Sequence, residues 1–307
     1  MLVAERNGAR TLYLNGKPDA STAVEDLETQ LLLAHAPLFL SPKARSILII
    51  GHGSGITLGS ALRHPVARVD VAEISSSVRV ADALFAEDNH HALADPRVHV
   101  YREDGQSFLR TTPRRYDVIV SEPSNPWMVG ISDLFTVEFF EVARGQLEPG
   151  GVFCLWFHTY HQNDDGVRLV LRTLDAVFPH AIVFSDNDEG NLIVLASETR
   201  LRPDYGAMER RFERAEVRDD LARLGMRNLA GFFTHHRFSE DRFRGLLGEG
   251  PLNTASRQLL EYAAPRSYFL GEHSFFVERR DPLIHNRPPP TGLLLDGYLD
   301  WRRSRAR

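Results

Sequence analysis

Runs of hydrophobic residues, separated by polar and glycine-rich stretches, predict alternating strands and helices through the middle of this chain. Residues 47–50 form an unbroken aliphatic run, which is typical of a strand buried on both faces of a parallel sheet. Similar runs predict further strands at residues 68–74, 97–104, 116–122, 151–160, 181–186 and 191–197. Helical spacing lies between them, from Thr57 onward and over residues 76–87, 135–147 and 166–178. This alternation favours a doubly wound α/β domain.

The last two predicted strands should be antiparallel neighbours. The turn at residues 186–190 is too short for the crossover that a parallel pair needs. A mostly parallel sheet that ends in an antiparallel hairpin is the arrangement of adenosylmethionine-dependent transferases. We therefore predict the fold class α/β, with a methyltransferase-like Rossmann domain over residues 45–199.

A small β element and a helix precede this domain. Residues 9–22 alternate apolar and polar side chains around Asn15-Gly16, which is a strong signal for a hairpin. A segment with helical spacing follows, with Ser21 or Thr22 as its N-cap. We assign residues 1–44 to an N-terminal β-hairpin and helix.

The pattern changes beyond residue 200. Residues 204–248 are charged and helical, residues 250–281 are mixed, and residues 282–291 are rich in proline. We predict that residues 200–307 form a C-terminal extension of helical and mixed structure. The arginine-rich end of the chain is interpreted as a solvated tail.

A glycine-rich turn follows the strand at residues 47–50 at once. Gly51, Gly53 and Gly55 let the backbone bend sharply and approach a ligand, and the next helix would direct its N-terminus at that ligand. The alternative is an ordinary tight turn without a ligand, which the same glycines would also suit.

Two acidic residues at the ends of the next strands favour a nucleoside ligand. Glu73 lies 22 positions after Gly51, where a carboxylate can accept both ribose hydroxyl hydrogens. Asp104, followed by Gly105, would lie beside the base, where it can accept from the exocyclic amine of adenine. Either acid alone is compatible with a solvated strand end. Together with the glycine turn they favour an adenosylmethionine-like ligand over a nicotinamide dinucleotide.

A long connection, residues 121–141, follows the fourth predicted strand. It carries two prolines and Gly130 before the next helix, and loops of this length in compact domains are usually functional. We interpret residues 123–133 as a lid over the pocket. Glu122 heads this lid at the carboxyl edge of the sheet, where such folds carry out chemistry, and it is the candidate catalytic residue. The alternative is a loop charge without a catalytic role.

Composition narrows the ligand class and the compartment. The 307 residues are 43% hydrophobic and 25% charged, as expected of a globular chain. A net charge of −5 and a pI near 6.2 give no electrostatic case for nucleic acid. The single cysteine, Cys154, excludes an intramolecular disulfide and a cysteine-cluster metal site, and we expect no metal. The N-terminus lacks the apolar core of a signal peptide and no run is long enough for a membrane span, so we expect a cytoplasmic location without a membrane partner.

Residues 12–197 contain, in order, the motifs LNGKPDAST, LAHAPL, ILIIGHGSGIT, VDVAEI, DPRVHVYREDGQSFL, YDVIVSEPSNPW, LFTVEFFE and LEPGGVFCLW. Together they resemble the spermidine synthase family of polyamine aminopropyltransferases, and within it the divergent bacterial branch. The resemblance weakens after residue 200. It implies a small N-terminal β domain joined to a methyltransferase-like Rossmann domain, commonly as a homodimer. It also implies decarboxylated S-adenosylmethionine as co-substrate and a small amine or polyamine as acceptor.

The resemblance implies roles for the residues of the nucleoside half of the site. Gly51, Gly53 and Gly55 match the family's glycine loop, Glu73 matches its ribose ligand, and Asp104 matches its adenine ligand.

The amine half of the site departs from the family. Glu122 stands at the aspartate thought to deprotonate the attacking amine. Ser54 stands where the family carries an aspartate that holds the aminopropyl ammonium of the donor, and Asn125 replaces a second amine-binding aspartate. Thr29 or its neighbours replace a tyrosine that assists catalysis.

Other residues would then have to bind the acceptor. The acidic candidates are Asp19, Glu25, Asp26 and Asp133. The aromatic candidates, able to wall a methylene chain or to face a cation, are Trp127, Trp156 and Tyr160. His158 and His161 flank Tyr160, and we interpret both as structural or surface histidines that bind no metal.

We predict a transferase that moves an aminopropyl group from decarboxylated S-adenosylmethionine to a small amine or polyamine. The alternative enzyme is a methyltransferase, because a pocket with Ser54 in place of aspartate could accept the carboxylate of S-adenosylmethionine. A third alternative is a catalytically silent nucleoside-binding module, in which Glu122 would be turned away from the pocket.

Overall fold

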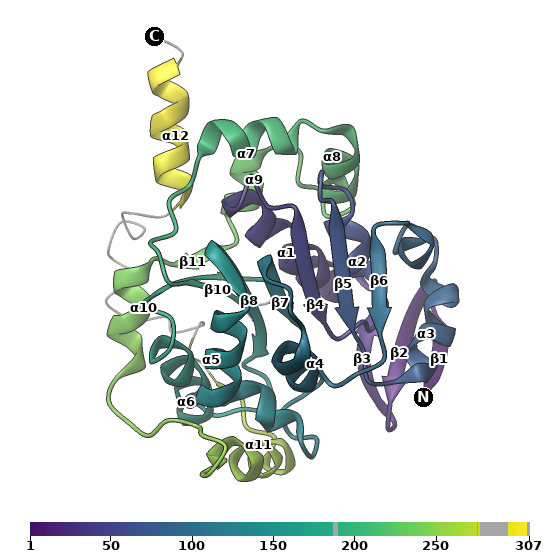
Figure 1. Ribbon diagram of the computed structural model, residues 1–307, viewed down its shortest axis with the longest axis vertical. Helices are drawn as coiled ribbons and strands as arrows, with labels where there is room; N and C mark the ends of the chain where they lie inside the picture. The colour runs from purple at the N-terminus through teal and green to yellow at the C-terminus, as the bar shows by residue number, and fades with distance from the viewer. Residues whose placement is uncertain (187–189, 275, 277–293, 306–307) are drawn as a thin grey trace.

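The computed structural model describes residues 1–186, 190–274, 276 and 294–305 (Figure 1). Within these residues the centre is an eight-stranded sheet with the order β11-β9-β10-β8-β7-β4-β5-β6. Its strands are β4 (Ser46–Ile50), β5 (Arg68–Ala72), β6 (Val98–Tyr101), β7 (Tyr116–Ser121), β8 (Leu147–His158), β9 (His180–Ser185), β10 (Asn191–Ser197) and β11 (His236–Phe238). The first five pair in parallel, whereas β10, β9 and β11 add antiparallel pairs. The predicted parallel sheet with a closing antiparallel pair is confirmed.

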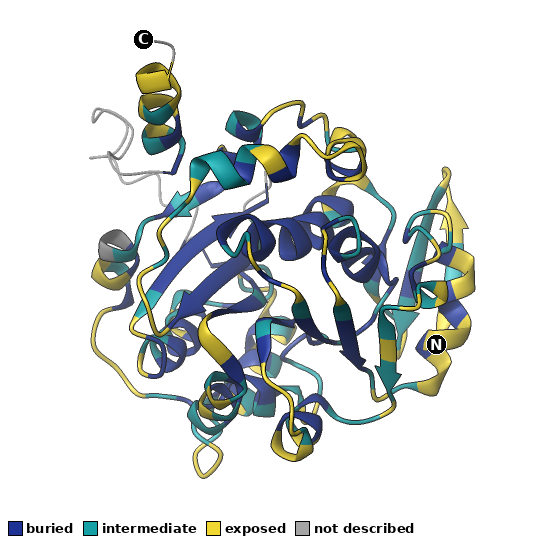
Figure 2. Ribbon diagram, turned by 45° about the horizontal axis from the view of Figure 1, so that its top comes forward, coloured by how far each residue is buried: buried dark blue, intermediate teal, exposed yellow. Residues whose placement is uncertain are grey.

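Two hydrophobic cores sandwich this sheet. In β4, Ile47 and Ile49 belong to one core while Leu48 and Ile50 belong to the other, because successive side chains of a strand point to opposite faces. The first core is covered by α1 (Val24–Leu40), α2 (Ile56–Ala61), α7 (Tyr205–Phe212), α8 (Ala215–Ala222), α9 (Leu229–Phe233) and α12 (Leu294–Arg305). The second is covered by α4 (Gly105–Thr111), α5 (Val137–Gly145), α6 (Asp164–Asp175), α10 (Glu240–Leu247) and α11 (Leu259–Leu270). Figure 1 shows the sheet between the α7–α9 group and the α5–α6 pair, and Figure 2 shows its central strands almost wholly buried.

The N-terminal segment forms a separate antiparallel sheet of β1 (Leu2–Arg6), β2 (Ala9–Leu14) and β3 (Lys17–Ser21). The predicted turn at Asn15-Gly16 is confirmed, and its two residues have φ values of 50° and 81°, as a tight hairpin turn requires. β1 was not predicted. It pairs with β2 through a second turn of the same kind at Asn7-Gly8, where φ is 52° and 81°.

The start of α1 differs from the prediction. Ala23 is the N-cap, and no side chain caps the helix there. The Ser21 hydroxyl instead donates to Asp26 Oδ2 at 2.5 Å and accepts from Ala23 N at 3.3 Å. The prediction of Ser21 or Thr22 as N-cap is therefore wrong, because Asp26 occupies the Ser21 hydroxyl.

The end of the third predicted strand also shifts. β6 stops at Tyr101, and Asp104 is the N-cap of α4, a helix that was not predicted. Its Oδ1 accepts from Ser107 N at 2.9 Å. Asp104 therefore lies at a helix start rather than at a strand end, although it stays at the same edge of the sheet.

Two predicted helices are shorter than expected. The helix at residues 76–87 ends as α3 (Ser76–Asp82) and continues as the 3₁₀ turn η1 (Ala83–Phe85). Residues 135–147 divide into the end of the 3₁₀ turn η3 (Ile131–Phe135) and α5. β8 already begins at Leu147, four residues before the predicted start of this strand, and Pro149 lies within it. A register shift in the pairing of β7 with β8 accommodates this start.

The C-terminal extension contributes to the main sheet. β11 pairs with β9, and it was not predicted because three residues give no strand pattern. Residues 204–248 are otherwise mostly helical, as predicted.

The domain boundaries after residues 44 and 199 stay predictions. Residues 187–189, the proline-rich segment 282–291 and the last two residues of the arginine-rich tail lie outside the described part. No transmembrane segment is found among the described helices.

A buried polar chain connects this extension to α1. Arg211 Nη1 lies 3.1 Å from His64 Nδ1, His64 Nε2 lies 2.8 Å from His35 Nδ1, and His35 Nε2 lies 3.0 Å from Asp220 Oδ2. Because arginine only donates, each ring accepts one hydrogen bond and donates the next, which suits two neutral histidines. Burial, together with His35 and Arg211, also lowers the pKa of His64 well below its ordinary value. This series of hydrogen bonds therefore links the guanidinium of Arg211 to the carboxylate of Asp220.

Candidate active site

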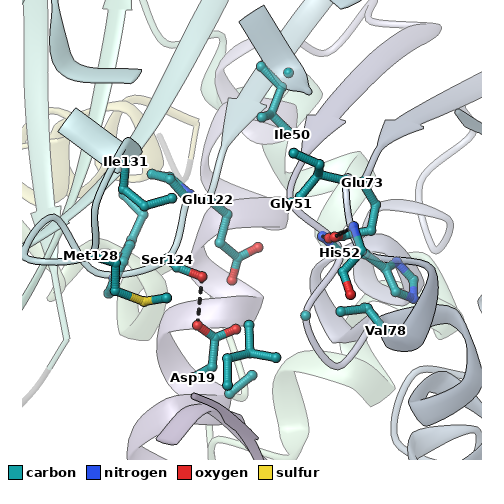
Figure 3. A pocket seen from close by; sticks show the side chains of 18 of the residues that line it. Asp19, Ile50, Gly51, His52, Glu73, Val78, Glu122, Ser124, Met128 and Ile131 are labelled. Atoms are coloured by element: carbon teal, nitrogen blue, oxygen red, sulfur yellow. Dashed lines mark hydrogen bonds between the residues drawn. The ribbon is translucent and has the colours of Figure 1, made fainter. Parts of the chain in front are cut away.

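A cavity of about 530 Å³ lies at the carboxyl ends of β4, β5 and β7 and is bordered by the N-terminal sheet and α1 (Figure 3). Pockets for small ligands usually have volumes of roughly 300–1,000 Å³. The acidic residues in its wall are Asp19, Asp26, Glu73, Asp104 and Glu122, and no lysine or arginine is among the described residues that line it. The cavity therefore suits a ligand that carries positive charge.

Gly51 allows the catalytic candidate to approach the glycine turn. Gly51 N donates to Ala72 O at 3.0 Å, and Glu122 N donates to Ile50 O at 2.9 Å, so adjacent parallel strands deliver both residues to one edge. A β-carbon at position 51 would lie 2.3 Å from Glu122 O, and the φ of Gly51 is +89°. Only glycine fits here without displacing the backbone of Glu122.

Glu73 faces the cavity with its carboxylate held by the backbone. Its Oε2 accepts from His52 N at 3.0 Å and its Oε1 accepts from Ser75 N at 2.6 Å. Each oxygen keeps a second lone pair for a ligand hydroxyl. Asp104 and Gly105 also line the cavity, so the structure brings together the residues predicted for the nucleoside half. Their roles stay predictions.

Glu122 points into the cavity toward Asp19 (Figure 3). Burial raises the pKa of Glu122 to about 8, the carboxylates of Asp19 and Asp26 add to this, and the Thr57 hydroxyl opposes it. Burial also raises the pKa of Asp19 to about 6, against the hydrogen bond from Ser124, whose hydroxyl donates to Asp19 Oδ1 at 2.8 Å. In the unliganded protein Glu122 is therefore mostly protonated at neutral pH, and a cation bound beside it would lower its pKa.

Six predicted site residues do not line the cavity, among them the acidic candidates Glu25 and Asp133. Glu25 is exposed at the start of α1, and Asp133 accepts a hydrogen bond from Gln258. Ser54 is 1% exposed, and its hydroxyl donates to Gln30 Oε1. Gly55 is the N-cap of α2. Asn125 is buried, and Trp127 lies outside the lining as well. The structure thus places Gly51 and Gly53 of the glycine turn at the cavity, whereas Ser54 and Gly55 lie outside its lining.

Tyr160 and Trp156 form an aromatic wall. Trp156 Nε1 donates to Asn191 Oδ1 at 2.9 Å, and all three residues line the cavity. Trp127 packs behind Tyr160, with ring centroids 6.4 Å apart. His158 Nδ1 donates to Tyr160 O at 2.7 Å, and burial lowers the pKa of His158 to about 3. A neutral, buried His158 agrees with the structural role expected of it.

Three cavity residues were missed by the sequence reasoning. His52 lines the cavity with its Nε2 2.8 Å from Asp82 Oδ1, and its place between two glycines of the turn was the available signal. Ser124 ties the lid to Asp19, and Gln30 comes from α1. No sequence pattern indicates either residue, because the direction of each side chain depends on how distant segments pack.

The predicted lid is held by the C-terminal extension. Ser132 Oγ lies 2.6 Å from Glu261 Oε2 and 3.1 Å from Gln258 Oε1, and Gly130 N donates to Glu261 Oε1 at 3.3 Å. Residues at the start of α11 thus fix the lid segment without a ligand. Further ordering of residues 123–133 on ligand binding stays a prediction.

The fold and the cavity define an α/β protein of the methyltransferase-like type with an acidic pocket at the carboxyl edge of its sheet. The model of the spermine/spermidine synthase domain matches residues 27–185, which is more than half of the chain. The chain belongs to the spermine/spermidine synthase family.

Named relatives agree with this membership. The polyamine aminopropyltransferase of Corynebacterium efficiens is 31% identical over 187 residues, which cover 60% of this chain and 36% of that protein. The spermidine synthase of Coffea arabica is 34% identical over 147 residues, covering 45% of this chain and 46% of that protein. The chain thus spans less than half the length of these two relatives. Among solved structures, a spermidine synthase in complex with the transition state analogue AdoDATO superposes with a TM-score of 0.58 at 23% identity, covering 74% of this chain and 88% of that chain. At this identity the likeness shows the fold alone.

Removing either nucleoside-facing acid should weaken nucleoside binding. Glu73→Ala and Asp104→Ala should each raise the Kd for methylthioadenosine by several-fold up to about a hundredfold, because each removes charge-assisted hydrogen bonds of about 1.5–3 kcal/mol. Titration calorimetry measures this directly. Asp104→Asn is the matched variant, because its side-chain oxygen can still cap α4 while the charge is lost. Unchanged binding in both alanine variants would refute the assignment of this half of the pocket.

Loosening the lid should expose it to proteases. Glu261→Ala removes the acceptor for both Ser132 and Gly130, so cleavage within residues 123–133 of the unliganded protein should become several-fold faster, because proteolysis follows the population of the open form. Bound methylthioadenosine should slow cleavage in both proteins. Glu249→Ala, at an exposed position of the same extension, is the control. Cleavage at one rate in all samples would show that this segment is no lid.

Proposed function

We propose that this chain transfers an aminopropyl group from decarboxylated S-adenosylmethionine to a small amine or polyamine. The observation that carries the proposal is the cavity itself, in which Glu122 faces inward among four further acidic residues and no lysine or arginine is found among the described lining residues. A sulfonium donor with an ammonium tail and a polyamine acceptor are both cationic. Such a wall attracts them, and its described residues offer no lysine or arginine to an anionic ligand.

In this reaction Glu73, Asp104 and Glu122 would each have a separate role. Glu73 would accept hydrogen bonds from the ribose hydroxyls and Asp104 from the adenine amine, which fixes the donor along the ends of β5 and β6. An alkyl amine has a pKa near 10 and arrives protonated, but only the neutral amine attacks. Glu122 would take that proton. The nitrogen then bonds to the carbon beside the sulfonium, the carbon–sulfur bond breaks, and methylthioadenosine leaves with the electron pair on sulfur.

The electrostatics of Glu122 support its role as base. Burial raises its pKa to about 8, and a general base is most effective when its pKa lies near the working pH. The cationic donor would lower this pKa on binding, so the carboxylate would become available when the acceptor enters.

The donor should be the decarboxylated form. S-adenosylmethionine carries a carboxylate, which would meet acidic residues and no described lysine or arginine in this cavity. Ser54, which had favoured a methyltransferase, leaves no free hydroxyl for that carboxylate, because it donates to Gln30. The experiment is calorimetry with both sulfonium compounds in parallel. We expect decarboxylated S-adenosylmethionine to bind at least about tenfold more tightly. Equal affinity or the reverse preference would favour the methyltransferase.

The silent module is the other alternative. It requires Glu122 to turn away from the pocket, and the inward direction of this side chain argues against it. Absence of product from every pairing of donor and amine would favour it instead. A homodimer and a cytoplasmic location stay predictions from the family resemblance and the sequence.

A further inference from the structure

Three acidic residues of the cavity remain once the nucleoside is placed. Glu73 and Asp104 are needed for the ribose and the base, which leaves Asp19, Asp26 and Glu122 for the amine half. Glu122 serves the reacting nitrogen. A polyamine has a second ammonium group, and one of the two other carboxylates is free to meet it.

Asp19 and Asp26 differ in their surroundings. The carboxylate of Asp19 already accepts a hydrogen bond from Ser124 of the lid, and the nearby charges of Glu73 and Asp26 add to its raised pKa. Asp26 lies in the first turn of α1 and bonds to Ser21 at the end of β3, and the charged groups that act on it are Glu25 and Asp186. Asp26 therefore reaches the cavity from α1 and not from the strand ends that carry Glu73 and Glu122.

Asp26 has capacity for a ligand. Its Oδ2 accepts from Ser21 at 2.5 Å, whereas its Oδ1 has no partner among the described residues. Burial raises the pKa of Asp26 against the hydrogen bond from Ser21, and no cation is among the described groups that act on this carboxylate. Asp26 also contributes to the raised pKa values of Glu122 and Tyr160, although burial is the larger cause for both. It is thus within electrostatic reach of the base and of the aromatic wall.

A second observation points to a ligand at the same place. Thr29 lies three positions after Asp26, hence on the same face of α1, and it lines the cavity. It is 6% exposed, and its hydroxyl has no hydrogen-bond partner within the part of the chain that the structure describes. A buried polar group without a partner is costly unless a ligand or water satisfies it. Tyr160 and Trp156 complete this end of the cavity with rings that can pack on methylene groups and face a cation.

We infer that Asp26, assisted by the Thr29 hydroxyl, binds the ammonium group of the acceptor that does not react. This role rests on the proposed function. α1 would thereby determine the preference for acceptors with a second amine. Ser54 and Asn125 stand where the family carries amine-binding aspartates, and neither provides a carboxylate for this purpose. Asp26 is a specificity residue in this scheme, and Glu122 is the base.

The test compares putrescine, a diamine, with butylamine, a monoamine of the same chain length. In Asp26→Asn the kcat/KM for putrescine should fall about ten- to a hundredfold, because a charge-assisted hydrogen bond is lost, while the value for butylamine should fall much less. Asparagine can still accept from Ser21. Thr29→Val should shift the same ratio by a smaller factor. Glu25→Gln is the control, because it removes a charge at the adjacent exposed position of α1, outside the cavity lining. Glu25 acts on Asp26 only through its charge, so any change should be small and the same for both amines.

A binding measurement separates this inference from the proposed function. Calorimetry with putrescine, on protein saturated with methylthioadenosine, needs no turnover and should show the same loss of affinity in Asp26→Asn. If wild type makes no product with any donor, the proposed function fails, and the calorimetry still decides the role of Asp26. Equal losses for both amines, no loss in Asp26→Asn, an equal loss in Glu25→Gln, or no binding of putrescine by wild type would each overturn the inference.

Discussion

Replacing Glu122 with glutamine should lower single-turnover product formation by about two to four orders of magnitude while donor binding survives. Glutamine keeps the size and hydrogen-bonding capacity of the side chain but takes up no proton at neutral pH. The measurement uses a panel of diamines with both sulfonium donors. Glu122→Asp should retain more activity than Glu122→Gln, because it keeps a carboxylate on a shorter arm. Full activity in Glu122→Gln would remove this residue from the mechanism.

The pH profile offers an independent signature of the same group. Burial raises the pKa of Glu122 to about 8, and the ionised form is the active base. The kcat/KM for the donor, which reports the unliganded protein, should therefore rise with pH up to about 8 in wild type, and Glu122→Gln should lose this limb while the ionisation of the amine itself remains.

Stability should change in the opposite direction from activity. The pKa of Glu122 is about 8 in the folded protein against 4.5 ordinarily, so its contribution to stability is present below pH 4.5 and is lost as the pH rises through 8. Unliganded Glu122→Gln should therefore melt roughly 2–6 °C above wild type at alkaline pH and at nearly the same temperature in acid. A lower melting temperature at alkaline pH would contradict the burial of this carboxyl.

Replacing Asp220 with alanine should destabilise the fold by about 3–5 kcal/mol, because the buried guanidinium of Arg211 and the buried histidine donors would be left without the compensating carboxylate. Asp220 is 2% exposed, and its carboxylate accepts from His35 and His90 at 3.0 Å each and from Arg223 at 2.9 Å. Without the Asp220 carboxylate, the series of hydrogen bonds that begins at Arg211 has no acceptor at its end. Thermal and denaturant unfolding should show a fall in melting temperature of roughly 5–15 °C.

A neighbouring position supplies the control for this variant. Asp219 lies in the same helix with a side chain 75% exposed, so Asp219→Ala removes the same charge and should change stability by less than about 0.5 kcal/mol. Asp220→Asn should fall between the two, because an amide oxygen can still accept. Equal stability of Asp219→Ala and Asp220→Ala would show that the buried chain does not hold the extension.

The same network predicts acid lability. Burial opposes ionisation of Asp220, but hydrogen bonds from His35 and His90 prevail and hold its pKa well below the ordinary value, while the pKa of His64 is also lowered. Both groups bind more protons in the unfolded chain. Wild type should thus lose stability as the pH falls below about 6.5, where the unfolded His64 takes up a proton and becomes charged, and further below about 4, where the unfolded Asp220 takes up a proton and becomes neutral.

Local patterns determined most of the fold. The aliphatic run of β4 and the Asn15-Gly16 turn could be read from the sequence, because burial on both faces and a positive φ impose residue types at fixed short spacings. The positions of the residues at the strand ends followed from the predicted strands. Parallel strands end at one edge, so Gly51, Glu73 and Glu122 had to meet once the strands were known.

Tertiary packing decided the rest of the candidate site. Ser54 stands in the glycine turn, yet its hydroxyl is taken by Gln30 of α1, and no local pattern reports a contact 24 positions away. The pairing of Ser124 with Asp19 and the hold of Glu261 on the lid join segments more than a hundred positions apart. Periodicity reports only whether a side chain faces a core or solvent. Which distant side chain it meets there depends on how three or more elements pack together, and the sequence by itself does not determine that.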